Sequence, residues 1–71
     1  MAKQITDAKF KKIMASLKGV ATDFELDGME FTDEVAFDVA DGVLADNPGL
    51  KEYIVVKIGA RDYQGWLANQ F

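Results

Sequence analysis

The absence of cysteine and histidine is the feature that most constrains how this chain of 71 residues can fold. The core of so small a domain usually supplies only about 3–5 kcal/mol of net stability, and many such domains add a disulfide, a metal or a partner chain. No disulfide can form here, and the commonest zinc ligand is missing. Since 49% of the residues are apolar, we expect residues 1–71 to form one small globular domain, with self-association as the stabilising device still open.

The apolar residues near the N-terminus follow a helical period. Thr6 can cap a helix there, and Asp7 lies favourably in its first turn. The pattern predicts a helix from about residue 7 to 20 that ends near Gly19. The residues on its apolar stripe, at i, i+3, i+4, i+7 and i+11, are Phe10, Ile13, Met14, Leu17 and Ala21, with lysines on the other side.

Residues 24–31 alternate between apolar and acidic side chains on either side of Asp27 and Gly28. An Asp-Gly pair in this setting favours a two-residue hairpin loop, because a type I′ turn needs positive φ at both central positions. Glu25 would then face Glu30 across the hairpin, a like-charge pair that is mildly unfavourable unless a positive group approaches. We therefore predict a β-hairpin.

The next segment indicates a helix from Asp33 to Asp46 with Thr32 as its cap. Valines and alanines cover one face of this helix, and acidic residues cover the opposite face. Val35, Phe37 and Val39 also alternate, which leaves strands open, but the alanine content and the acidic face favour a helix.

The segment after residue 46 has two interpretations. Asn47, Pro48 and Gly49 suit a type II turn and suit a helix start equally well. Residues 53–58 are rich in β-branched and aromatic side chains, which favours a third strand. Asp62 can cap a short final helix.

The predicted fold is therefore α+β: helix, β-hairpin, helix, strand and short helix, with the helices covering one face of a three-stranded sheet. The alternative is an all-α arrangement of four helices in which residues 48–58 are helical.

The charges are strongly segregated along the chain. Nine carboxylates and no Lys or Arg occur between Lys18 and Lys51, within a net charge of −4. Such a field acts on association and solubility rather than on fold. Our leading hypothesis is a non-enzymatic acidic protein that binds a basic surface of another macromolecule. The residues expected to make this contact are Glu25, Glu30, Glu34, Asp38 and Asp41.

One form of this hypothesis is a nucleic-acid-mimicking inhibitor of phage or mobile-element origin, whose carboxylates occupy a groove that normally takes phosphates. The alternative, that the acids only keep the protein dispersed, explains the charges nearly as well. A second hypothesis is a small assembly subunit that forms homo-oligomers. Trp and Tyr are favoured interface anchors, so its contact would involve the C-terminal aromatic residues Tyr63, Trp66 and Phe71.

Residues 23–34 resemble an EF-hand calcium loop, with carboxylates at positions 1, 3, 5 and 12 and glycine at position 6. The resemblance implies Asp23, Glu25, Asp27 and Glu34 as ligands. The loop departs from the pattern with Glu at position 3, Leu26 at position 4 and Glu30 at position 8, and the chain holds no second loop. We therefore expect no calcium binding at physiological concentrations, and no cofactor.

Other classes of function find less support. The six glycines are scattered singly, and no acid pair or nucleophile stands in a catalytic pattern, so we expect no enzyme. On the predicted N-terminal helix the lysine side holds no arginine and no aromatic residue, which argues against direct nucleic-acid binding. No leader pattern and no apolar run of about 20 residues occurs, so we expect a cytoplasmic protein without a membrane contact.

Overall fold

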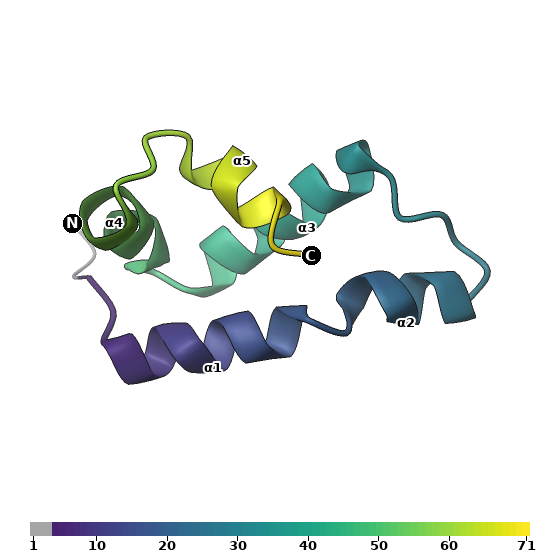
Figure 1. The fold of residues 1–71 in the computed structure, drawn as a ribbon, viewed down its shortest axis with the longest axis horizontal. Helices are drawn as coiled ribbons and strands as arrows, with labels where there is room; N and C mark the ends of the chain where they lie inside the picture. The colour runs from purple at the N-terminus through teal and green to yellow at the C-terminus, as the bar shows by residue number, and fades with distance from the viewer. Residues whose placement is uncertain (1–3) are drawn as a thin grey trace.

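The computed structural model describes residues 4–71, and over that range the chain is helical with short connections (Figure 1). The predicted α+β fold is wrong, because no strand occurs in the described range, and the all-α alternative fits. The elements are α1 (Asp7–Leu17), α2 (Val20–Leu26), α3 (Asp33–Asp46), α4 (Leu50–Tyr53), the π-helix η1 (Ile54–Ile58) and α5 (Tyr63–Ala68).

The helices that begin at a capping residue form where the sequence predicts them. The Thr6 hydroxyl accepts a hydrogen bond from the Lys9 amide at 3.2 Å, and the Thr32 hydroxyl accepts one from the Val35 amide at 3.2 Å. Helix α3 has the predicted bounds. Helix α1 ends at Leu17, before the predicted end, and a short turn leads into α2, which the sequence pattern did not predict.

The predicted hairpin at residues 24–31 is absent because Gly28 ends helix α2. Its amide donates to the Glu25 carbonyl at 3.0 Å, and the Met29 amide donates to the Phe24 carbonyl at 2.9 Å. These two bonds form a Schellman motif, which needs positive φ at one residue only. Gly28 has φ +80°, whereas Asp27 has φ −81° and could not occupy a type I′ turn.

Residues 47–50 form a type II turn, one of the two alternatives that the sequence left open. The Leu50 amide donates to the Asn47 carbonyl at 3.0 Å, and Gly49 has φ +96° and ψ −14°. Helix α4 begins directly after the turn, so the predicted strand at residues 53–58 is wrong as well. With no hairpin beside it, this segment has no strand to pair with, so its β-propensity is not realised. As a helix, the segment buries Ile54 in the core.

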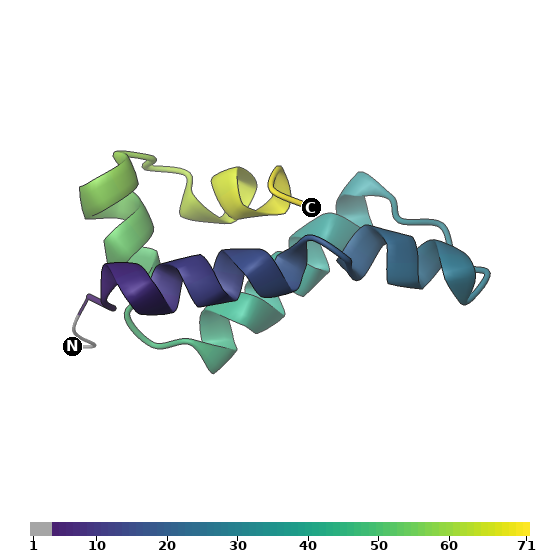
Figure 2. The ribbon, with the colours of Figure 1, turned by 60° about the horizontal axis from the view of Figure 1, so that its bottom comes forward.

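The core lies between the helices rather than on a sheet. Figures 1 and 2 show α1 crossing α3, with α4 and η1 at one end and α5 lying against α3. Aromatic contacts join α1 to the C-terminal half, because the Phe10 ring stacks on Tyr53 at 4.3 Å and meets Trp66 at 6.1 Å between centroids. The buried residues of the hydrophobic core are Ile5, Ile13, Leu17, Ala36, Ala40, Leu50, Tyr53, Ile54, Leu67 and Ala68.

Helix α2 and the loop 27–32 extend away from this core (Figure 1). The protein measures 38 × 22 × 18 Å, and α2 contains no buried residue. A chain of aromatic contacts holds the segment, since Phe31 meets Phe24 at 5.2 Å and Phe71 at 5.5 Å between ring centroids. None of the helices within residues 4–71 has the length and apolar character that a membrane crossing requires.

The buried Tyr53 connects α4 to the start of α1. Its hydroxyl donates a hydrogen bond to the Asp7 carboxylate at 2.8 Å. This bond, together with burial and the negative charge of Asp7, raises the pKa of Tyr53 above its usual 10.0. The folded state therefore holds the phenolic proton more tightly than the unfolded chain does.

A spectrophotometric titration tests this contact. In a Tyr63→Phe variant, where Tyr53 is the remaining tyrosine, we expect ionisation above pH 10.0, and addition of Asp7→Asn should lower the titration midpoint. The stability contributed by the raised pKa is complete below pH 10.0 and is lost as the pH rises through the folded-state value. The control Asp27→Asn should leave the titration midpoint of Tyr53 unchanged. If Asp7→Asn also leaves it unchanged, the hydrogen bond to Asp7 is not the cause of the raised pKa.

Candidate interaction surface

The outward side of α3 carries an acidic face made of Glu34, Asp38 and Asp41. These residues share one side because a helix turns about 100° per residue, and spacings of three and four return to the same side. All three are exposed, whereas Ala36 and Ala40 on the opposite side are 7% and 0% exposed. The structure therefore brings these three residues together on one solvent-facing helix surface.

The acidic face has a defined length, and one of its residues is held in place by a neighbouring helix. Glu34 and Asp41 are separated by about 10.5 Å along the helix axis, at about 1.5 Å per residue. Asp41 is held by α5, since Gln64 Nε2 donates a hydrogen bond to its Oδ1 at 3.0 Å. A carboxylate offers about four acceptor positions, so Asp41 can still bind a cationic group.

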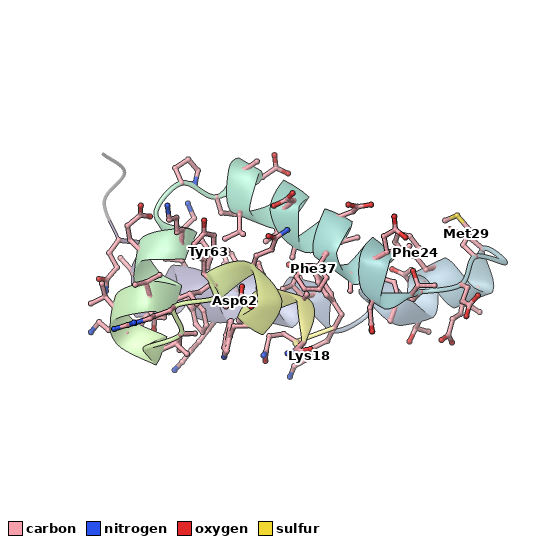
Figure 3. The ribbon with its side chains drawn as sticks, turned by 90° about the horizontal axis from the view of Figure 1, so that it is seen from above. Lys18, Phe24, Met29, Phe37, Asp62 and Tyr63 are labelled. Carbon is pink, nitrogen blue, oxygen red and sulfur yellow. The ribbon has the colours of Figure 1, made fainter. Side chains whose placement is uncertain are left out.

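Phe37 is a surface residue that the sequence analysis did not single out. Its side chain is 41% exposed and lies one helical turn from both Glu34 and Asp41. Figure 3 shows it on α3 close to α5. The signal was present in the sequence, because on a helix Phe37 falls at the boundary between the apolar and acidic sides. An aromatic residue in this position is typical of an interface anchor.

Glu25 and Glu30 do not face each other across a hairpin. Glu25 lies on α2 and Glu30 in the loop that follows, where both are exposed. Between them Leu26 and Met29 are 80% and 51% exposed, a second feature that the sequence analysis did not anticipate. We call this part of the protein the acidic end, and it consists of Glu25, Leu26, Asp27, Met29 and Glu30.

A contrasting surface occurs on η1 and the loop that follows. Val55, Val56 and Ile58 are 37%, 68% and 41% exposed, and the exposed Lys57 and Arg61 accompany them. We call these five residues the basic end. This surface was not predicted, because the β-branched residues of the segment favour a strand. On a helix, consecutive apolar residues point in different directions and cannot all face one core.

The C-terminal aromatic residues make contacts within the protein. Tyr63, Trp66 and Phe71 are partly buried and pack against the core. Lys51 Nζ lies 5.0 Å from the centroid of the Tyr63 ring, a cation–π contact. A homo-oligomeric contact through these three residues stays a prediction, and it would use the part of each ring that the core leaves exposed.

The residues of the EF-hand-like segment do not share a loop. Asp23 and Glu25 are in helix α2, Asp27 caps that helix, and Glu34 is in α3. Within residues 4–71 no group of three or more potential metal ligands comes together, and the same part of the chain shows no pocket.

Comparisons of this chain with family models, with curated proteins and with solved structures found no significant match.

Proposed function

We propose that this protein is a non-enzymatic interaction protein that binds a basic surface of another macromolecule through the acidic face of α3. The observation that carries the proposal is the alignment of Glu34, Asp38 and Asp41 on one exposed helix surface. Like charges at a spacing of four residues destabilise a helix slightly, yet the sequence places no lysine or arginine between residues 18 and 51. A cationic partner would relieve that repulsion.

The dimensions of the acidic face limit what it can bind. Its charges span about 10.5 Å, while one strand of B-DNA carries a phosphate about every 3.4 Å along the axis. The face therefore spans about three phosphate-to-phosphate intervals, and it suits a compact basic patch or groove on a protein. Phe37 can add an apolar contact or a cation–π contact to a partner's Arg or Lys. Nucleic acid itself would be repelled.

Charge reversal on the acidic face provides the test. Wild-type protein is used to capture partners from a lysate, and the purified partner is then titrated with wild type and with Glu34→Lys/Asp38→Lys. We expect affinity to fall by about tenfold or more, because two attractive contacts become repulsive. We also expect wild-type affinity to weaken as salt screens the field.

A double variant on the same helix serves as the control. Asp33→Lys/Asp46→Lys makes the same change in net charge and also alters one first-turn carboxylate, but both residues lie outside the acidic face. We expect it to bind nearly as well as wild type. Equal binding by wild type and both double variants, each folded by circular dichroism, would refute the proposal and leave the acids as a solvated surface.

A further inference from the structure

The two ends of the protein are complementary in charge and alike in apolar exposure. The acidic end, residues 25–30, contains three carboxylates and no base, and the basic end, residues 55–61, contains two bases and no carboxylate. Each end also exposes apolar side chains. The most exposed of these is Leu26, at 80%, in the acidic end and Val56, at 68%, in the basic end. Burial of such side chains against a second surface is favourable.

The two ends lie at opposite extremities of an elongated protein. In Figures 1 and 2, α2 with its loop and α4 with η1 occupy the two ends of the long axis, along which the protein measures 38 Å. The ends therefore cannot meet within one copy. They can meet when the acidic end of one copy contacts the basic end of another.

The backbone at each end presents these side chains outward. The Schellman motif at Gly28 ends α2 and leaves Leu26 and Met29 in solvent. At the other end η1 is a π-helix, a rare conformation that occurs frequently at functional sites. Gly59, with φ +82°, ends it. Both ends are thus formed by helix termini whose apolar side chains stay exposed, partly or largely, within residues 4–71.

We propose that the occupant of each end is a second copy of this chain, joined head to tail. A two-fold axis through either end would place that end against itself and so oppose charges of the same sign. An antiparallel two-fold dimer would pair unlike ends, but it would stop at the dimer. The head-to-tail contact pairs Glu25, Asp27 and Glu30 with Lys57 and Arg61 and buries the apolar residues between them. It uses residues outside the acidic face of α3, so it does not depend on the proposed function.

A head-to-tail contact leaves one free acidic end and one free basic end on every assembly. Oligomers therefore grow beyond the dimer as concentration rises. Because each junction pairs exposed opposite charges, salt shortens the assemblies.

A complementation experiment tests the arrangement by sedimentation velocity and light scattering. One variant, Leu26→Ser/Met29→Ser, has a defective acidic end, and the other, Val55→Ser/Val56→Ser, has a defective basic end. We expect wild type to show a mass that increases past the dimer with concentration and decreases with salt. Each variant alone should be monomeric, and an equimolar mixture should stop at the dimer, since one intact junction remains. Circular dichroism checks that both variants keep the helical content of wild type.

Three results would overturn the proposal. The first is wild-type protein whose mass does not pass the dimer up to millimolar concentration. A monomer that binds vesicles of anionic lipid through its basic end would count as this result. The second is dimerisation by either variant alone, which would indicate a symmetric contact or one through other residues. The third is a mixture of the two variants that stays monomeric where wild type associates. None of these results bears on capture of a basic partner by the acidic face.

Discussion

Replacement of Leu67 with alanine is expected to leave much of the protein unfolded at 25 °C. The Leu67 side chain is 0% exposed in the centre of the core. Truncation of a buried leucine to alanine costs about 2–5 kcal/mol, because the lost apolar contacts leave a cavity that relaxes only in part. The core of a domain of this size supplies about 3–5 kcal/mol in total. Urea denaturation followed by circular dichroism measures the loss.

The chain offers a matched control for this experiment. Leu26 is also a helical leucine, but its side chain is 80% exposed. We expect Leu26→Ala to change the free energy of unfolding by less than about 0.5 kcal/mol, the usual range for surface substitutions. Similar losses for the two variants would contradict the assigned core, in which α5 packs against α3 and α1.

Substitution of glycine by alanine should have opposite effects at two positions, one inside α3 and one in the α3–α4 turn. Gly49 has φ +96° and is buried, so Gly49→Ala forces an L-residue into the left-handed region and should destabilise the protein by about 1–2 kcal/mol. Gly42 lies inside α3 with open space where its Cβ would be. We expect Gly42→Ala to stabilise the protein by about 0.8–1 kcal/mol through helix propensity.

Thermal melting of the two variants measures this difference in sign. A stabilising effect of Gly49→Ala would refute the type II turn, since the alternative helix start at Asn47 does not require positive φ at that position. A destabilising effect of Gly42→Ala would contradict the orientation of α3, because a methyl group there should point into solvent.

The elements that could be predicted from sequence are those determined within a few residues. A capping side chain binds an amide three positions ahead, and Asp62 does so for α5, where its Oδ1 accepts from the Gly65 amide at 3.0 Å. The type II turn is equally local, because Pro48 and Gly49 supply its dihedral angles, although the same residues also suit a helix start. These contacts require no knowledge of the rest of the fold.

The elements that could not be predicted depend on distant partners. Gly28 supplies positive φ to a hairpin or to a helix C-terminus, and local sequence does not distinguish the two. Residues 54–58 have high β-propensity, but that propensity reflects packing beside other strands, and none forms here within residues 4–71. Both errors had one origin, since the third strand was predicted to complete a sheet with the hairpin.

Of the candidate surfaces, one could be predicted from the sequence and two could not. The acidic face of α3 followed from helical periodicity alone, and all three carboxylates are exposed as expected. The acidic and basic ends could not be found from sequence, because their apolar residues are exposed only through the path of the helices around them. Leu26 and Val56 occur in patterns that also fit a buried strand, and the tertiary arrangement decides their exposure.

Because α2 contains no buried residue, we expect α2 to open at a lower free energy than the core unfolds. Local opening of a segment requires only the free energy of the contacts that the segment itself makes. Helix α2 can therefore unwind, and release the contact of Phe24 with Phe31, while every buried residue of the core stays covered. Opening of α2 is consequently an equilibrium of its own, with a smaller free energy than cooperative unfolding of the core. A ligand that binds the folded α2 suppresses this opening.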